Sequence, residues 1–277
     1  MINYEELTPV EDRGGILFKR DDKFAPFGSN CVNGGKLRQS FILIRSEVEK
    51  NNINRLIAGC SMISLQGPIV AVTAREFGID CTIVYGGTNV KSLGKNLMSS
   101  IAKKYGAKFH IAKSGRSAVL LHYARGIKKE NDYIVRYSMD GISKERILAT
   151  ANQVENIPDR LDNLIVACGS GVTSTGILYG IEKFKKKVGD IYLVGTAPNR
   201  EKKIIAELEG MNVNPKIKYI DYFGMGVAYS AKYKYVWGGI RMHPNYEGKA
   251  FHFLLNNVDY KNEKTLLWIV GKEPTRG

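Results

Sequence analysis

Residue types that define several protein classes are scarce in this chain of 277 residues. It has four cysteines and four histidines, with no C-x-x-C pair and no histidine at ligand spacing, which argues against a metal centre and a disulfide framework. The cysteines stand singly in apolar or glycine-containing segments, as small buried side chains do. A reactive thiol at Cys31, shortly before Lys36, is the less favoured alternative.

Long apolar runs are also missing. No stretch approaches the roughly 18 apolar residues that a membrane-spanning helix needs, and residues 1–6 show neither part of a secretory signal. We therefore expect a cytoplasmic protein without a membrane anchor. With 44% hydrophobic and 25% charged residues, the composition is that of a folded protein, and its length fits one large or two ordinary domains.

Acidic residues are fewer than basic ones. The 27 Asp and Glu against 41 Lys and Arg leave a formal net charge of +14, which favours an anionic partner. Basic runs at 183–187 and 232–235 contain aromatic residues and so fit a nucleic-acid backbone with stacked bases. Solvated surface charge, or a general enrichment in Lys, Ile and Asn, explains the same surplus. A nucleic acid or nucleotide partner is therefore one of several explanations of the net positive charge.

Short apolar segments alternate with segments of helical spacing. This alternation predicts an α/β fold whose parallel sheets are covered by helices on both faces. Four strand-helix units between residues 41 and 150 would form a small domain, and residues 1–40 with 151–277 a large one. The predicted strands are 55–59, 81–85, 108–112, 133–136, 164–168, 191–195 and 266–270.

A glycine turn followed by a lysine, Gly34-Gly35-Lys36, lies at the start of a predicted apolar helix. Lysine is nucleophilic only when neutral, and burial or a neighbouring cation lowers its pKa enough for Schiff-base formation near neutral pH. Lys36 is therefore a candidate for attack on a carbonyl. In a chain so rich in lysine, a solvated cation beside a turn is the alternative that this motif alone leaves open.

A second glycine-rich segment, residues 168–176, follows a predicted strand and opens a predicted helix. Its main-chain N–H groups, the helix dipole and the hydroxyls of Ser170 and Thr173 would converge on a phosphate. The segment lacks the patterns of triphosphate and dinucleotide loops, so a monophosphate fits it best; a tight turn with a Ser/Thr cap is the alternative. Together with an aldehyde-capturing lysine, this phosphate cradle suggests pyridoxal 5'-phosphate (PLP).

Six ordered motifs are similar to those of a known family. The chain resembles the fold-type II PLP-dependent enzymes, in particular the branch of 1-aminocyclopropane-1-carboxylate deaminase and D-cysteine desulfhydrase. The resemblance implies two parallel-sheet, three-layer domains like those of the tryptophan synthase β-subunit, a PLP cofactor and a homodimer. The motifs are Thr8–Glu11, Phe18–Asp22, Gly34–Arg38, Gly169–Gly176, Asp221–Phe223 and Tyr246–Ala250.

The resemblance also implies roles for single residues. Lys36 would hold PLP as an internal aldimine and then act as the base at the substrate's Cα or a neighbouring carbon. Tyr246 would be an active-site tyrosine, and Glu247 would face the pyridine nitrogen and favour its protonated form. Without the resemblance, an acidic residue at a helix start would be the simpler interpretation of Glu247. The cofactor phosphate would lie on Gly169, Ser170, Gly171, Val172 and Thr173.

The segment 59–68 matches the family loop that reads Ser-Asn-His or Ser-Asn-Gln. Ser64 and Gln66 match that loop, and the resemblance implies that Ser64 acts in catalysis and that both residues bind substrate, together with Tyr222. Leu65 stands where the family has asparagine. That asparagine hydrogen-bonds the phenolic oxygen of PLP, and a leucine side chain cannot donate a hydrogen bond.

Two further departures accompany Leu65. Asn33 precedes the two glycines instead of following them, and the glycine-rich tail after the last strand reads Gly-Lys-Glu-Pro at 271–274. We therefore expect a PLP-dependent lyase or deaminase acting on an unusual small amino-acid-like substrate. The net charge of +14 favours, as one alternative, an aminoacylated or amino-modified nucleotide in DNA or RNA. A cofactor- or nucleic-acid-binding protein without catalysis is a second alternative, against which Lys36 argues.

Overall fold

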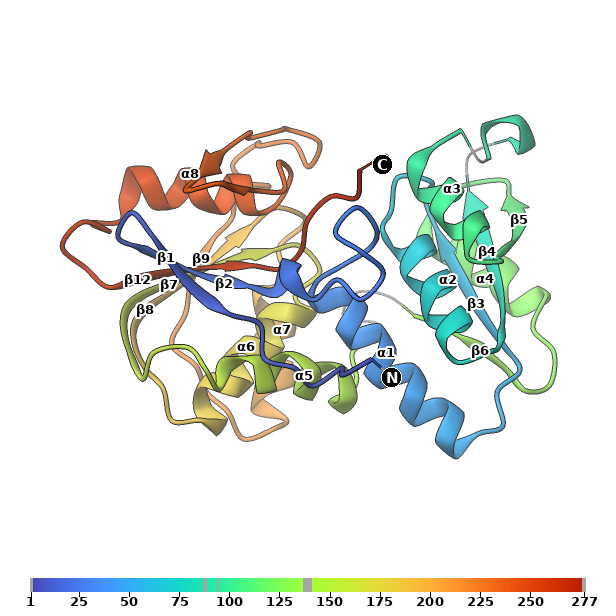
Figure 1. Cartoon of the computed structure of the whole chain (residues 1–277), viewed down its shortest axis with the longest axis horizontal. Coiled ribbons are helices and arrows are strands. Elements are labelled where there is room, and N and C mark those ends of the chain that lie inside the picture. Colours follow the sequence, from blue (N-terminus) through green and yellow to red (C-terminus); the bar gives the residue numbers. More distant parts are fainter. Residues whose placement is uncertain (1, 87–88, 94, 137–140, 276–277) are drawn as a thin grey trace. The chain divides into compact units, whose positions relative to one another are not determined.

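The computed structural model describes residues 2–86, 89–93, 95–136 and 141–275, which divide into two compact units (Figure 1). The sequence analysis expected the chain to change domain at 40/41 and 150/151. In the structure the corresponding changes fall at 39/40 and 141/142. Unit 1 comprises residues 1–26, 33–39 and 142–273, and unit 2 comprises residues 27–32, 40–141 and 274–277.

Unit 1 is built on a six-stranded sheet of order β1-β2-β12-β7-β8-β9. The edge strand β1 forms an antiparallel hairpin with β2, and every other pairing in this sheet is parallel. The central strand β12 is buried along its whole length, as expected for a strand covered on both faces. The strands are β1 (Val10–Arg13), β2 (Ile16–Arg20), β7 (Arg160–Cys168), β8 (Lys187–Gly195), β9 (Lys218–Ile220) and β12 (Thr265–Ile269), with a separate pair β10 (Val236–Trp237) and β11 (Ile240–Arg241).

Helices cover both faces of this sheet. On one face, α8 (Glu247–Asn257) packs Phe251 and Leu254 against apolar residues of β2, β7 and β12, and the other helices lie on the opposite face (Figure 1). These are α5 (Lys144–Ala151), α6 (Val172–Lys183) and α7 (Glu201–Glu209), with 3-10 turns η1 (Asp21–Lys23) and η4 (Asn152–Val154).

Helix α5 lies in unit 1, although the sequence analysis ended the small domain at residue 150. The reason is its close packing against α6. A Cβ added at Gly176 would lie 2.6 Å from the Cβ of Thr150, and one added at Gly180 would lie 2.6 Å from the carbonyl oxygen of Ala151. The two glycines therefore let these helices approach more closely than larger residues would allow.

Unit 2 is a three-layer unit around a parallel sheet of order β5-β4-β3-β6. Leu43, Val70 and Ala102 pack on one face of the sheet, and Leu120 and Ala124 pack on the other. The strands are β3 (Arg55–Cys60), β4 (Asp80–Gly86), β5 (Lys108–Ala112) and β6 (Asp132–Ile134). The helices are α2 (Gln66–Glu76), α3 (Leu97–Lys104) and α4 (Ser117–Gly126), with the 3-10 turn η2 (Val90–Ser92); α1 (Gly35–Lys50) begins in unit 1 and continues into unit 2.

The fold class predicted from the sequence is confirmed. All seven predicted strands are present, as β3, β4, β5, β6, β7, β8 and β12. The β1–β2 hairpin was not predicted, because its charged residues mask the alternation of buried and exposed positions. Over the described residues, no helix combines the length and apolar character needed to cross a membrane.

Candidate active site

Lys36 is the second residue of α1 and follows two glycines with tightly constrained backbone. Gly34 has φ +84°, a left-handed conformation that favours glycine, and an added Cβ would lie 2.2 Å from the carbonyl oxygen of Val270. The N–H of Gly35 donates a hydrogen bond to that same oxygen over 2.9 Å. The glycines thus let the start of α1 dock against the end of β12, and this contact fixes where Lys36 begins.

Val270 also connects α1 to α8. Its N–H donates to Oε1 of Glu247 over 3.0 Å, while its carbonyl accepts the bond from Gly35. Glu247 is 2% exposed, and its Oε2 has no hydrogen-bond partner among the described residues. Burial raises the pKa of Glu247 to about 7, although two backbone hydrogen bonds and the charge of Lys36 oppose this shift.

The amine of Lys36 lies 5.2 Å from the centroid of the Tyr246 ring. Although the side chain as a whole is exposed, the protein packed around its amine removes water and lowers the pKa of Lys36. The carboxylate of Glu247 opposes this shift. No residue in the described part of the chain forms a hydrogen bond with Nζ, so the amine is available for reaction.

The predicted phosphate cradle, residues 169–173, lies at the junction of β7 and α6. Gly171 is left-handed, with φ +94°, and its carbonyl accepts from the N–H of Thr175 over 2.9 Å as the first bond of the helix. The N–H groups of residues 172–174 therefore precede the first intrahelical bond and point out of the helix start. The cradle contacts α1 through Gln39, which donates to Oγ1 of Thr173 over 3.2 Å.

Tyr246 brings these parts together. Its ring lies beside Lys36, it immediately precedes Glu247, and its Cε1 atom lies 3.4 Å from the position of a Cβ added at Gly169. The lysine amine, the carboxylate and the phosphate cradle thus meet around one aromatic ring within unit 1. These residues fit PLP, because the buried Oε2 of Glu247 is an unused acceptor for the pyridine N–H and the cradle suits a monophosphate.

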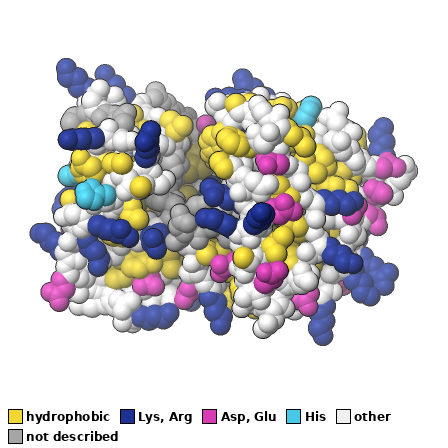
Figure 2. Space-filling model, turned by 180° about the vertical axis from the view of Figure 1, so that it is seen from behind, with side chains coloured by type: hydrophobic (Ala, Val, Ile, Leu, Met, Phe, Trp, Pro, Cys, Tyr) yellow, Lys and Arg dark blue, Asp and Glu magenta, His cyan; other side chains and the backbone are white. Residues whose placement is uncertain are grey.

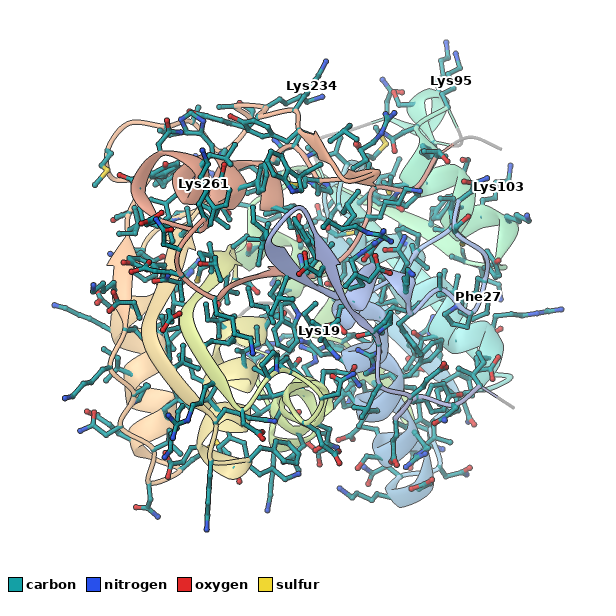
Figure 3. The ribbon with its side chains drawn as sticks, turned by 60° about the vertical axis from the view of Figure 1, so that its left-hand side comes forward. Lys19, Phe27, Lys95, Lys103, Lys234 and Lys261 are labelled. Carbon is teal, nitrogen blue, oxygen red and sulfur yellow. The ribbon has the colours of Figure 1, made fainter. Side chains whose placement is uncertain are left out.

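The motifs Thr8–Glu11 and Phe18–Asp22 hold α1 in place but supply none of the proposed cofactor contacts. Asp21 is fully buried and accepts hydrogen bonds from Thr8 Oγ1, Arg38 Nη1 and Trp268 Nε1 at 2.9–3.1 Å. Lys19 is buried in the same network (Figure 3) and donates to the Thr8 carbonyl over 2.6 Å. Burial lowers the pKa of Lys19 to about 8. This network anchors the first turn of α1, since Arg38 lies two residues after Lys36.

The two departures at Asn33 and at 271–274 contact each other. The side chain of Asn33 donates to the carbonyl of Lys272 over 3.1 Å and accepts from its N–H over 2.7 Å. This reciprocal pair holds the loop before α1 against the segment after β12. The moved asparagine therefore has a structural role on the same side of the site as Val270.

Two neighbours of Tyr246 were missed by the sequence analysis. The ring of His243 lies 4.7 Å from the Tyr246 ring, and burial, followed by the charge of Lys36, lowers the pKa of His243 to about 4. The hydroxyl of Tyr229 forms a hydrogen bond with the hydroxyl of Tyr246. Neither residue stands in a spacing pattern, so only the folded chain reveals them.

Ser64 and Gln66 lie in unit 2, at the start of α2. The Oγ of Ser64 accepts from the N–H of Gln66 over 3.3 Å, and Leu65 between them is half-buried. In unit 1, Tyr222 is half-buried against the apolar cluster under α8, and burial raises its pKa. The substrate-binding roles of Ser64, Gln66 and Tyr222, and the catalytic role of Ser64, stay predictions.

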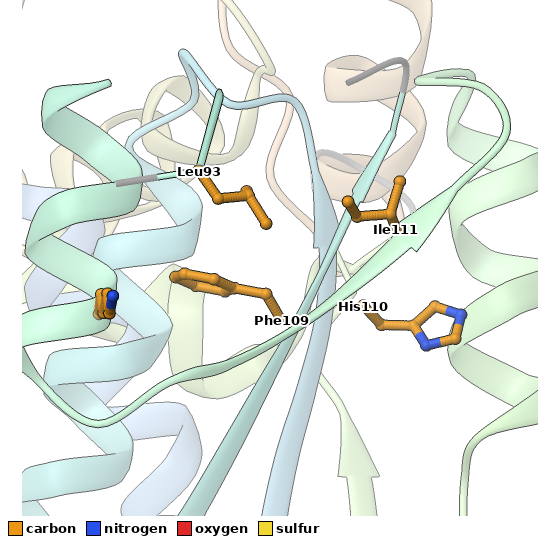
Figure 4. Close-up of a pocket in the computed structure, with 5 residues that line it drawn as sticks. Leu93, Phe109, His110 and Ile111 are labelled. Carbon is orange, nitrogen blue, oxygen red and sulfur yellow. The ribbon is translucent and has the colours of Figure 1, made fainter. Parts of the chain in front are cut away.

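A separate hollow of about 460 Å³ lies in unit 2 (Figure 4). It is lined by Leu93, Lys103, Phe109, His110 and Ile111. In the figure, Leu93 and Phe109 point toward one another, whereas the ring of His110 points away from them. This hollow contains neither Ser64 nor Gln66, and its lining offers one cation and mainly apolar side chains.

Solved structures with this arrangement of elements define the class of fold. An ACC deaminase homologue matches with a TM-score of 0.74 at 20% identity, covering 96% of this chain and 89% of that one. A PLP-dependent aspartate racemase matches with a TM-score of 0.66 at 14% identity, over 95% and 89% of the two chains. The chain therefore has the fold of the fold-type II PLP-dependent enzymes, which confirms the resemblance seen in its sequence.

Curated relatives are more specific. The chain is 27% identical to the O-seryl-dTMP PLP-dependent decarboxylase of Salmonella phage ViI, over 98% of its own length and 81% of that protein. It is 25% identical to the glycyl-dTMP PLP-dependent decarboxylase of Pseudomonas phage M6, over 96% and 98% of the two chains. No family model matches the sequence. Both relatives are PLP-dependent enzymes, in agreement with the cofactor predicted from the sequence.

Proposed function

We propose that this chain is a PLP-dependent decarboxylase that acts on an amino acid carried by a thymidine nucleotide. The buried Oε2 of Glu247, which has no partner in the described part of the chain and lies in the same unit as Lys36 and the cradle, is the observation that supports the cofactor. The two phage relatives support the reaction and the substrate class. They favour decarboxylation over the deamination or elimination that the sequence analysis left open. Homodimer formation and a cytoplasmic location stay predictions.

Different residues of unit 1 have different roles in such a reaction. When bound, PLP supplies an electron sink for the pair left on Cα as the bond to the carboxylate breaks and CO2 leaves. Glu247 holds a proton at the pyridine nitrogen, and the N–H groups before α6 hold the phosphate. Lys36 delivers a proton to Cα to complete the reaction, and its lowered pKa lets its amine exchange protons nearer neutral pH. Tyr246 limits how far the Lys36 amine moves.

The first experiment is the visible spectrum of the purified protein mixed with PLP. Wild type should show the absorption band of a lysine-bound cofactor, and Lys36→Ala should lose it. Lys19→Met is a matched control, because Lys19 is a buried lysine of the same unit that touches none of the proposed cofactor groups. A wild-type protein that stays colourless would contradict the proposal, as would a Lys36→Ala variant that keeps the band.

The second experiment is turnover of a thymidine oligonucleotide that carries seryl or glycyl substituents. Mass spectrometry should show a product lighter by one CO2, and Lys36→Ala should lower the rate by at least about a thousandfold. Free serine and glycine serve as controls for the nucleotide requirement. Release of ammonia with retention of the carboxylate would support a deaminase instead and overturn the proposed reaction.

A further inference from the structure

Exposed apolar side chains gather on one segment of unit 1. Four of the six large hydrophobic residues that are exposed in the described chain lie between residues 223 and 236, which we call the 223–236 segment. Several solvent-exposed aromatic or aliphatic side chains close together are typical of a binding surface. These residues are Phe223 (39% exposed), Met225 (72%), Tyr229 (42%) and Val236 (63%).

This segment is held against the candidate active site. The ring of Tyr229 lies 5.9 Å from that of Tyr246, and their hydroxyls are hydrogen-bonded. The buried amine of Lys249 donates to the carbonyls of Ala228 and Tyr229 over 2.8 and 3.2 Å. The amide of Asn245 also donates to the Tyr229 carbonyl, over 3.2 Å. The exposed Tyr229 is therefore in direct contact with Tyr246, the residue whose ring lies beside the Lys36 amine.

The basic run within this segment alternates between two faces. Tyr233 and Tyr235 turn toward α8, where both rings contact His252 and the Tyr235 hydroxyl bonds its Nδ1 over 2.8 Å. These tyrosines are therefore engaged in packing and are not the stacking platform that the sequence pattern suggested. Lys232 and Lys234 are exposed, and Lys234 projects into solvent (Figure 3). No acidic residue of the described chain pairs with either lysine.

The other basic run is used differently. In the run 183–187, Lys183 donates to Oδ1 of Asn152 over 2.7 Å, and Lys186 forms an ion pair with Asp159 over 2.8 Å. These bonds hold the turn between α6 and β8 against residues 152–159. Elsewhere, basic side chains are spread among acidic ones on the face shown in Figure 2, without a single large patch. The lysines of the 223–236 segment differ in two respects. They have no acidic partner in the described chain, and exposed aromatic rings of the same segment lie next to the candidate site.

We infer that the 223–236 segment binds the DNA strand that carries the substrate nucleotide. Phe223 and Tyr229 stack on bases, and Lys232 and Lys234 contact backbone phosphates. Aromatic faces beside cations are the combination that holds unstacked nucleotides, and the net charge of +14 complements a polyanion. The inference rests on the proposed function, because a nucleotide-linked substrate determines the choice of DNA over a second protein.

The test compares the PLP-loaded wild-type protein with three variants. Fluorescence anisotropy measures binding to a labelled single-stranded thymidine oligonucleotide over a series of salt concentrations, with free dTMP as competitor. The variants are Lys232→Ala with Lys234→Ala, Phe223→Ala alone, and the control Lys261→Ala with Lys264→Ala. The control removes two exposed lysines of the same unit and so makes the same change in charge.

We expect Lys232→Ala with Lys234→Ala to lower the slope of log affinity against log salt by about 1 to 1.5. Phe223→Ala should weaken binding by at least about fivefold with an unchanged slope, because a stacked ring is lost and no charge changes. The control should match wild type. All variants should keep the visible cofactor band and their turnover of a free aminoacyl nucleotide, since none of these side chains contacts Lys36, Glu247 or the cradle.

Several outcomes would overturn the inference while the proposed function stands. These are a wild-type protein that turns over the free nucleotide without binding DNA at low salt, equal losses in the control, and competition by dTMP as strong as by the oligonucleotide. A change of oligomeric state in Phe223→Ala with unchanged DNA binding would assign the segment to a protein interface instead. Loss of the cofactor band and of all turnover in wild type would overturn the proposed function itself.

Discussion

The starts of α1 and α2 are built in different ways. At α1, residues 33–38 bond to residues outside the helix and its loop: Gly35 to Val270, Asn33 to Lys272 and Arg38 to Asp21. At α2, Ser64 accepts a bond from the neighbouring Gln66, Leu65 has no polar side chain, and Ile63 is 74% exposed. The start that positions Lys36 is thus held by many buried contacts, whereas residues 63–65 are held by few. Such a difference would let residues 63–65 change while the lysine stays in place.

The largest effect should come from Gly34→Ala. The new Cβ would meet the Val270 carbonyl oxygen at 2.2 Å on a residue with φ +84°, so we expect a loss of about 4 kcal/mol or more of unfolding free energy. Gly15→Ala is the matched control, because Gly15 has the same φ of +84° but no atom within 4 Å of an added Cβ. It should cost about 1–2 kcal/mol. Urea unfolding measures both, and equal losses would show that the close contact at α1 is unimportant.

Glu247→Gln should change how stability depends on pH. The pKa of Glu247 is raised from 4.5 to about 7 by burial, so the folded protein without cofactor keeps a proton that the unfolded chain releases. Its contribution to the unfolding free energy should therefore fall between about pH 4.5 and 7, by up to about 3 kcal/mol, while His243, with its pKa lowered from 6.5 to about 4, adds a rise over nearly the same range. Glu247→Gln should remove the fall and leave an unfolding free energy that rises more steeply with pH than in wild type, and Glu182→Gln, at an exposed position, should follow wild type. An equal dependence of the unfolding free energy on pH in Glu247→Gln and wild type would refute the assignment.

A smaller loss is expected from Asn33→Ala. It removes both hydrogen bonds to the backbone of Lys272, which should lower the unfolding free energy by about 2 kcal/mol. Asn33→Asp keeps the acceptor and loses the donor, so it should cost about half as much. Denaturant midpoints distinguish the two variants. If Asn33→Ala unfolds like wild type, the loop before α1 does not depend on this pair.

The smallest effect on stability should come from Leu65→Asn at the start of α2. A half-buried loop position with few contacts should change the unfolding free energy by no more than about 0.5 kcal/mol. If the loop faces the cofactor as the resemblance implies, the restored donor should shift the visible band, whereas Leu65→Ala should leave its position unchanged. Identical spectra for both variants would show that residue 65 does not contact PLP.

Much of this protein follows from local patterns. The strands 164–168 and 266–270 are apolar runs. The glycines around Lys36 and in the cradle predict turns, because glycine readily adopts the positive φ found at Gly34 and Gly171. The hairpin β1–β2 escaped notice because Lys19 is a charged residue buried by partners distant in sequence, Asn156 among them. The exposed pair Lys232 and Lys234 was visible as a charge run, but the orientation of Tyr233 and Tyr235 was not.

The sequence by itself determined the α/β class, the lysine in its glycine turn, the glycine-rich helix start at α6 and, through ordered motifs, the cofactor. Spacing and residue type are local properties, and each of these features lies within a short segment. Only the tertiary structure decided that Val270 joins Gly35, next to Lys36, to Glu247, that Oε2 of Glu247 has no partner among the described residues, and that the rings of His243 and Tyr229 flank Tyr246. Those relations depend on contacts between residues far apart in the chain, which no local pattern encodes.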